Sequence, residues 1–419
     1  MSRSKFYGWK LVAVLFFVYL SATIALVGGN IINTFMAKQL DMKRSLFGAG
    51  FALAYLLVGF VSPLAASVAK KVGERVTISI GLLMIMTGAL LMSFIGNTSG
   101  GYMAGFGLII GTGSAFATVL PIQTLITRWF ERKRALATGV VLSAGGFSGI
   151  VSSLMVNHII KSTNGNWKLA WIMIASLMGL ITLVAFFFIK NTPEELGQVP
   201  DGSVNSQNDS NRAQKQTKPK VYQTPESWGL KEALGTRALW LTLLAAAAQF
   251  IGYYLCLNHG MIHLMDVGIS NDLAALSPGI LLFASIGGRL LSGALGDHIE
   301  PRFIIMTGLM LTLIGCIALM NAVSPFLVYV YAVTVGLGFG LVYVCLFTML
   351  GNYFGTVNIR SFLGFLIPIV TLFGASAPLV GGIIKDRTGS YAMALTGTVV
   401  IAAVGSLLLF FARPPIKKQ

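Results

Sequence analysis

The stretch Ala274-ALSPGILLFASIGGRLLSGAL-Gly296 is long and apolar enough to cross a bilayer as a helix, and its only charged side chain is Arg289. Arg289 precedes Asp297 by eight residues, which corresponds to about 12 Å along a helix. A hydrocarbon core is about 30 Å thick, so we expect Arg289 near the middle of the membrane. A charge at that depth costs at least about 2.5 kcal/mol, and a negatively charged solute is the obvious compensation.

Similar apolar runs extend along the whole chain. Hydrophobic residues make up 55% of the sequence, charged residues make up 11%, and the mean hydropathy is +0.78, which excludes an ordinary soluble protein. The alternation typical of a β-barrel is absent from the sequence. We therefore predict an all-α polytopic membrane protein, with twelve transmembrane helices at about 11–33, 46–69, 77–95, 102–126, 136–159, 169–189, 238–258, 274–296, 303–322, 325–350, 361–384 and 391–412.

The net charge of +16 is unevenly distributed along the chain. If the N-terminus is inside, most of the Lys and Arg residues fall in predicted cytoplasmic segments, as the positive-inside rule requires. We expect both termini in the cytoplasm and the protein in a cell membrane, the inner membrane of a bacterium. The charge then reflects topology, and we expect no nucleic-acid partner.

A polar segment at 191–236 divides the chain into two sets of six predicted helices. We predict an N-terminal six-helix bundle (1–190), a cytoplasmic linker (191–236) and a C-terminal six-helix bundle (237–419). The middle of the linker, Val199–Thr224, has a mobile composition, and Glu226-SWGLKEALGT-Arg237 could form a short amphipathic helix on the membrane surface.

The two halves share a pattern. Gly111-TGSAFATVLPIQTLITRWFERKRALATG and Gly336-LGFGLVYVCLFTMLGNYFGTVNIRSFLG both begin G-x-G, and in both an aromatic pair and basic residues follow the span. Duplicated, pseudo-symmetric halves predict a substrate site between them at mid-membrane, with alternating access by rocking.

On these features the chain resembles the major facilitator superfamily, and within it the monocarboxylate porter and oxalate:formate antiporter branches. The segments that carry the resemblance are Tyr7-GW-Lys10, Arg128-WFERKRALATG, Leu230-KEALGTRALW and Gly260-MIHLMDVGIS. The stretch Gly288-RLLSGALGD also resembles the loop motif of the superfamily and ends at Asp297, whereas its first-half counterpart, Ala65-ASVAKKVGER, lacks the usual Asp.

The resemblance implies that Arg289 binds a substrate carboxylate, because both branches use an arginine in the eighth helix. Oxalate porters add a lysine in the eleventh helix, but Ser361-FLGFLIPIVTLFGAS is uncharged, which favours a monoanion. Animal-type monocarboxylate porters add a first-helix lysine and an aspartate four residues before the arginine. Here Asn30 and Asn33 are the polar groups of the first helix and Ser285 precedes Arg289, so the proton-coupling groups are not carried over.

Each candidate site residue also has a structural interpretation. Arg289 could pack against backbone carbonyls, the tyrosines could be packing or interfacial residues, and the amides could bond across helices. The candidate substrate ligands are Arg289, Tyr343, Tyr331, Asn30, Asn33, Gln123 and Ser285, and the candidate gating residues are Asp297 and Arg302.

The predicted function is secondary transport of a small organic anion, with lactate- or pyruvate-like monocarboxylates as the favoured class. The alternatives are an oxalate:formate-type anion antiporter and a sensor that no longer moves solute. Every Asp and Glu lies in a loop or at a span end, so we expect coupling by anion antiport or by symport of a proton with the substrate. We expect no enzyme activity, no cofactor and no metal, and a monomer whose partners are the anion and the lipid bilayer.

Overall fold

The computed structural model describes residues 6–40, 44–201 and 221–417. These residues form helices joined by short turns and loops, and in that part of the chain eleven helices are long and apolar enough to cross a membrane, or twelve if one bent pair counts as a single span. The structure thereby confirms the predicted fold class, an all-α membrane protein.

The bent pair corresponds to the second predicted span. Helix α2 (Arg44–Phe60) and helix α3 (Ser62–Val72) meet at an angle of 46°, measured between Gly48–Phe60 and Ser62–Val72. Pro63 lies in the first turn of α3, where its missing N–H is no loss and its ring favours the start of a helix. Gly73, with φ +84°, then ends α3.

The chain folds into two compact units. Unit 1 comprises residues 1–129, 144–198 and 363–371, and unit 2 comprises residues 130–143, 199–362 and 372–419. Each unit includes short segments from the other half of the sequence, so the predicted boundaries at 190 and 237 remain predictions.

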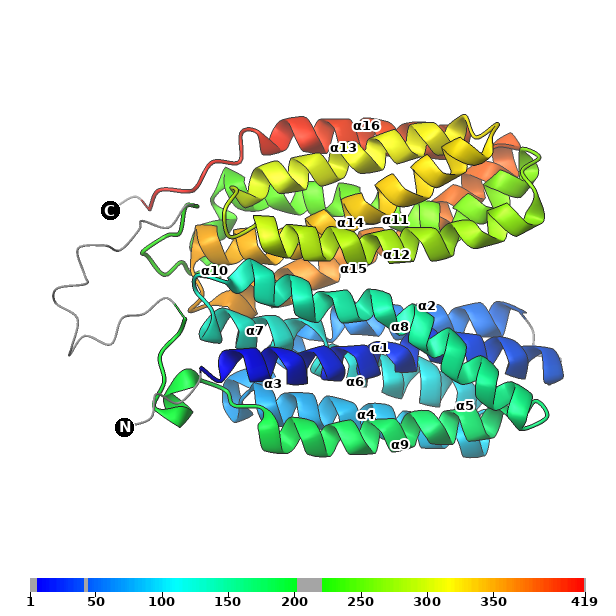
Figure 1. The fold of residues 1–419 in the computed structure, drawn as a ribbon, viewed down its shortest axis with the longest axis horizontal. Coiled ribbons are helices and arrows are strands. Elements are labelled where there is room, and N and C mark those ends of the chain that lie inside the picture. Colours follow the sequence, from blue (N-terminus) through cyan, green and yellow to red (C-terminus); the bar gives the residue numbers. More distant parts are fainter. Residues whose placement is uncertain (1–5, 41–43, 202–220, 418–419) are drawn as a thin grey trace. The chain divides into compact units, whose positions relative to one another are not determined.

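Unit 1 contains the helices of the first half, most of which are drawn in blue and cyan in Figure 1. Helix α9 lies beside α4 and α1, and α4 also contacts α6. A β-carbon added at Gly81 of α4 would lie 2.6 Å from the Gly113 carbonyl oxygen of α6, so these backbones approach closely. The helices are α1 (Gly8–Gln39), α2, α3, α4 (Glu74–Ile95), α5 (Ser99–Tyr102), the π-helix η1 (Met103–Ile110), α6 (Gly111–Ala117), α7 (Val119–Trp129), α8 (Arg134–Ser162) from Ala144 onward, α9 (Trp167–Phe188) and the 3-10 turn η2 (Pro193–Leu196).

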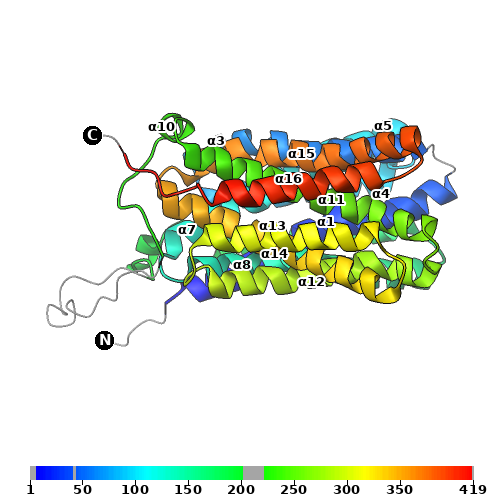
Figure 2. The ribbon, with the colours of Figure 1, turned by 90° about the horizontal axis from the view of Figure 1, so that it is seen from above.

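In unit 2, helix α14 packs against both α12 and α13, and α13 packs against α16 (Figures 1 and 2). Glycine again permits close contact, since a β-carbon at Gly308 of α13 would lie 2.7 Å from the Gly338 carbonyl oxygen of α14. The helices are α10 (Leu230–Leu234), α11 (Arg237–Asp266), α12 (Asn271–Leu295), α13 (Pro301–Met320), α14 (Pro325–Phe354), most of α15 (Ile359–Thr388) and α16 (Ala392–Leu409), together with the first turns of α8.

The predicted mobile linker, Val199–Thr224, is structured at both ends. Its middle, 202–220, lies outside the described residues. At one end the Asp201 carboxylate accepts hydrogen bonds from the backbone N–H groups of 131–133, and at the other the Thr224 N–H donates to the Asn352 carbonyl over 2.8 Å. Helix α10 lies within the predicted helical segment, and its placement on a membrane surface remains a prediction.

Candidate functional site

Arg289 is held at a point of close helix packing in unit 2. Its side chain is 6% exposed. A β-carbon at Gly139 of α8 would lie 2.6 Å from the Arg289 carbonyl oxygen, and one at Gly340 of α14 would lie 2.6 Å from the Arg289 nitrogen. Two glycines therefore let neighbouring backbones touch α12 at the residue that carries the charge.

The guanidinium group lies between a backbone carbonyl and two aromatic rings. Arg289 Nη1 donates to the carbonyl oxygen of Leu142 in α8. The guanidinium carbon is 5.1 Å from the centre of the Tyr343 ring and 5.7 Å from that of Phe339, both on α14. These are cation–π distances, which stabilise a partly desolvated cation without neutralising it.

Part of the hydrogen-bonding capacity of Arg289 is unused. Its Nε atom is buried and has no hydrogen-bond partner among the described residues. Nor does any Asp or Glu in 6–40, 44–201 or 221–417 form an ion pair with it; the pairs found there involve other residues. Since a buried charge normally requires a partner, the site is suited to an anion from outside the protein.

The aromatic rings around Arg289 form a continuous cluster from α11 and α14. Phe339 stacks on Tyr343 with ring centres 5.3 Å apart, and Phe250 of α11 contacts both rings. Tyr343 was predicted from the sequence, whereas Phe250 and Phe339 were missed, because aromatic residues are common throughout the spans. The cluster consists of Phe250, Tyr253, Phe339, Tyr343 and Phe347.

The structure gives the position of Arg289 along α12. Helix α12 ends at Leu295, six residues after Arg289, which is about 9 Å along the helix. Arg289 thus lies halfway between this end of α12 and its middle. Its expected position at the centre of the bilayer remains a prediction.

The other predicted ligands in unit 2 are arranged differently. Ser285 lies one turn before Arg289 and is fully buried, and its hydroxyl donates to the Leu282 carbonyl over 2.7 Å. Tyr331, also fully buried, donates its hydroxyl to the Cys256 carbonyl over 2.9 Å. Tyr343 is therefore the predicted tyrosine whose ring meets Arg289, while the Tyr331 hydroxyl bonds to α11.

The remaining predicted ligands belong to unit 1. Asn33 on α1 is fully buried, and neither of its amide atoms has a partner among the described residues. Gln123 on α7 is 1% exposed and has interactions of its own. The side chain of Asn30 lies outside the described part of the structure.

The two predicted gating residues do not form a pair with each other. Asp297 accepts hydrogen bonds from the backbone N–H groups of Ala135 (2.9 Å) and Leu136 (3.1 Å), at the start of α8. Burial raises the pKa of Asp297 from 3.8 to about 6, against the opposing effect of these bonds and of Arg134. Arg302 lies over Phe303 and donates to the Phe410 carbonyl over 3.4 Å.

An ion pair in the first half was not predicted from the sequence. Glu74, the first residue of α4, is fully buried and accepts a 2.9 Å bond from Arg128 Nη1 at the end of α7. Glu74 lies within the quoted stretch Ala65-ASVAKKVGER, and Arg128 is the first residue of Arg128-WFERKRALATG.

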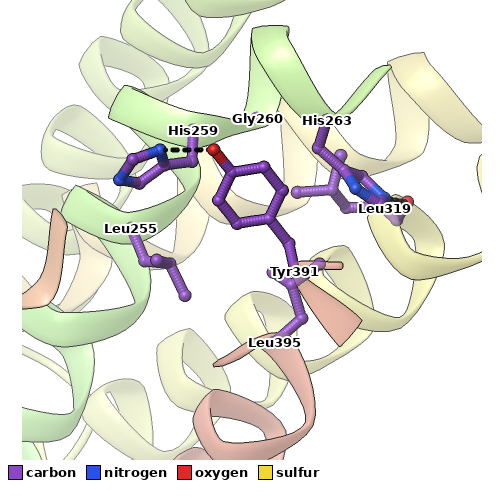
Figure 3. Close-up of a pocket in the computed structure, with 7 residues that line it drawn as sticks. All are labelled: Leu255, His259, Gly260, His263, Leu319, Tyr391 and Leu395. Atoms are coloured by element: carbon purple, nitrogen blue, oxygen red, sulfur yellow. Dashed lines mark hydrogen bonds between the residues drawn. The ribbon is translucent and has the colours of Figure 1, made fainter. Parts of the chain in front are cut away.

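A second cluster of polar side chains, His259, His263 and Tyr391, lies near one end of α11 in unit 2. Figure 3 shows the Tyr391 ring between His259 and His263, with the dashed bond joining the Tyr391 hydroxyl to His259 Nδ1 over 3.0 Å. His259 Nε2 donates to the Pro378 carbonyl (2.7 Å) and His263 Nε2 donates to the Leu319 carbonyl (3.1 Å). Both histidines therefore bond to the backbone of neighbouring segments. Among the described residues no group of three or more His, Cys, Asp or Glu could hold a metal ion.

The sequence model of the protein family described as Major Facilitator Superfamily matches residues 11–362 of the chain, which is most of its length. The chain belongs to this superfamily. It is accordingly a multi-pass membrane transporter and not an enzyme.

Several relatives within the superfamily are named monocarboxylate transporters. The chain is 24% identical to the Bos taurus protein named monocarboxylate transporter 13, over 86% of this chain and 80% of that protein. It is 28% identical to Homo sapiens monocarboxylate transporter 2, over 85% of this chain and 75% of that one. A Bacillus subtilis protein described as an uncharacterized transporter is 23% identical over 94% and 90% of the two chains.

Solved structures agree on the fold. The Escherichia coli fucose:proton symporter superposes with a TM-score of 0.69 at 16% identity, covering 98% of this superfamily member and all of the symporter chain. The human organic anion transporter MFSD10 superposes with a TM-score of 0.71 at 15% identity, over 96% and 99% of the two chains. At these identities the likeness concerns the fold alone.

Proposed function

We propose that this secondary transporter carries small monocarboxylates by alternating access and that Arg289 binds the carboxylate. The observation that carries the proposal is a buried guanidinium with cation–π contacts and no ion-pair partner among the described residues. Arginine presents its N–H groups in a planar fork that matches the two oxygens of a carboxylate.

The surroundings of Arg289 favour a small anion with an apolar body. The rings of Tyr343 and Phe339 lie against the guanidinium, and the Phe250 ring contacts both of them. Such rings offer contact to the methyl or methylene groups of a short acid, while Arg289 offers the charge. A solute with one charged end and one apolar end satisfies both features.

Arg289 is the one cationic side chain assigned to the substrate, which favours a monoanion over an oxalate-like dianion. In α15, the stretch 361–376 contains no charged residue, so it supplies no second cation. A second carboxylate without a partner in a low-dielectric site would cost several kcal/mol. The distant relatives named monocarboxylate transporters support the same class.

The mode of coupling follows from where the acidic residues lie. Glu74 is the buried carboxylate of α4, and it is paired with Arg128 at the end of α7. We therefore assign the coupling to the solute, either by exchange of anions or by a proton that travels with the carboxylate. The placement in a bacterial inner membrane with both termini in the cytoplasm is part of the same proposal.

A thermal-stability screen of the purified protein tests this function. Lactate, pyruvate, propionate, oxalate and malonate are added one at a time, and the melting temperature is recorded, since a ligand stabilises the state that it binds. We expect the three monocarboxylates to raise the melting temperature of the wild-type protein and to leave that of Arg289→Gln unchanged. If no monocarboxylate shifts the wild-type protein, or if both proteins shift alike, the proposal is wrong.

A further inference from the structure

The first turns of α8 lie directly against α12, and both segments belong to unit 2, which includes residues 130–143. At one end of this contact the Asp297 carboxylate accepts bonds from backbone N–H groups at the start of α8. One turn earlier in α12, a β-carbon at Gly293 would lie 3.1 Å from the α-carbon of Gly139. Another turn earlier, a β-carbon at Gly139 would lie 2.6 Å from the Arg289 carbonyl oxygen. The contact between the two helices therefore extends from Asp297 to the arginine.

Gly139 sets the distance between α8 and Arg289. The atoms that a β-carbon at this position would meet are backbone atoms of Arg289 and Gly293, which cannot rotate away as a flexible side chain can. A methyl group at 139 would therefore push the two helices apart. Leu142 follows Gly139 by three residues and lies near the same side of α8, where its carbonyl oxygen accepts the bond from Arg289 Nη1. This bond depends on the close approach that the glycine permits.

The bond to Leu142 orients the guanidinium group. Nη1 is held by the carbonyl, and the group lies over the rings of Tyr343 and Phe339 at 5.1 and 5.7 Å. Nε is buried and has no hydrogen-bond partner among the described residues. A carboxylate that takes two parallel N–H bonds requires a guanidinium with a defined direction. Holding the arginine in place before binding spares the entropy of ordering a long side chain.

We propose that Gly139 is a positioning residue of the carboxylate site, because it lets the Leu142 carbonyl hold Arg289 in the orientation that binds the substrate. The inference rests on the proposed binding of a carboxylate by Arg289. Gly139 itself touches no solute and acts through the arginine. A larger residue at 139 leaves the positive charge in place but removes its fixed direction, so substrate binding weakens while the later steps of transport continue.

The test measures KM and kcat for uptake of labelled lactate by vesicles that contain the wild-type protein or one of three glycine variants. Gly139→Ala is the test variant. Gly293→Ala crowds the same pair of helices one turn away from Arg289, and Gly287→Ala adds a methyl group in ordinary contact, 3.6 Å from the Leu337 side chain. We expect Gly139→Ala to raise KM about tenfold with kcat within about twofold of the wild type, and the two controls to keep KM within about threefold.

A backbone ester in place of the amide between Leu142 and Ser143 tests the carbonyl without adding an atom to the contact, and it decides the matter if Gly139→Ala does not fold. An ester carbonyl is a weaker acceptor, so we expect KM to rise at least about threefold, and an ester between Val141 and Leu142 to leave it unchanged.

Three results would overturn the inference. One is an unchanged KM in the ester variant between Leu142 and Ser143, and another is an equal rise of KM in all three glycine variants, which would mean that Gly139 only packs. The third is a fall of kcat at constant KM in Gly139→Ala, which would assign the contact to a later step of transport. Wild-type vesicles that do not take up lactate would instead overturn the proposed function together with this role of Gly139.

Discussion

At the scale of the residue, Arg289 is the side chain that the sequence singles out most clearly, and the proposed function depends on it. It could be recognised from sequence because its flanks are apolar and a charge among them is rare. Its neighbours could not be recognised, because Phe250 and Phe339 reach it only through the packing of α11 and α14. The sequence thus shows which residue is charged, and the tertiary structure shows that aromatic rings and a carbonyl surround it.

We predict that Arg289→Ala abolishes saturable uptake and that Arg289→Lys retains less than about a tenth of it. Alanine removes the charge that attracts the carboxylate, and lysine keeps the charge but not the two parallel donors of the guanidinium. The measurement is initial uptake of labelled lactate by reconstituted vesicles with equal amounts of protein. The matched control is Arg387→Ala, an exposed arginine in the last turn of α15. Near-normal uptake by the alanine variant would remove the central claim.

At the scale of the element, helix starts and ends carry several of the polar contacts in unit 2. Asp297 caps the first turn of α8, and Asp201 accepts the N–H groups just before it. Most of the span ends could be predicted to within about four residues, because apolar length is a strong signal, but α11 continues to Asp266, eight residues beyond the predicted end at 258. The bend between α2 and α3 and the ordered ends of the linker could not, since these depend on backbone geometry and on distant partners.

We predict that Asp297 makes the stability of the protein depend on pH between about 4 and about 6. Because burial raises its pKa, the folded protein binds the proton more tightly than the unfolded chain does, so stability is highest at low pH and falls as pH rises through this range. The asparagine side chain in Asp297→Asn is neutral at every pH, so this variant should not lose stability over this pH range. Its melting temperature relative to the wild type should therefore increase from pH 4 to pH 6 and stay constant above that. A difference that is independent of pH, or that decreases, would contradict the sign.

At the scale of the whole molecule, the fold and the superfamily could be predicted, whereas the substrate could not. Twelve apolar runs suffice to define the class, and the structure and the family match both agree with it. In the proposed function the choice of solute depends instead on a few polar atoms. Within the part of the chain that the structure describes, Arg289 Nε and the amide atoms of Asn33 have no hydrogen-bond partner, and this is visible only in the folded protein. Both residues could be named as candidate ligands from the sequence, but their hydrogen-bonding environment could not be predicted from it.

We predict that the transporter prefers monocarboxylates to dicarboxylates of similar size. Arg289 is one cation, and the stretch 361–376 of α15 supplies no second one, so a dianion would bury an unpaired charge. Inhibition constants for propionate and malonate against labelled lactate, measured in the same vesicles, should differ by about tenfold or more in favour of propionate. Stronger inhibition by malonate would show that a second cationic group takes part.

We also predict that uptake does not require sodium and survives the loss of either histidine of α11. His259 and His263 bond to the carbonyls of Pro378 and Leu319, which identifies them as links between segments of unit 2. Glutamine can replace one such donor, so His259→Gln and His263→Gln should keep more than about half of the wild-type uptake at pH 6 and pH 7.5, and replacing sodium by choline should change nothing. Preloading vesicles with unlabelled lactate then separates the two remaining modes of coupling. Strong stimulation of uptake without a pH gradient indicates exchange, whereas stimulation only by an inward proton gradient indicates symport. A steep sodium dependence, or complete loss of uptake in either histidine variant, would show that the coupling ion binds the protein and not the solute.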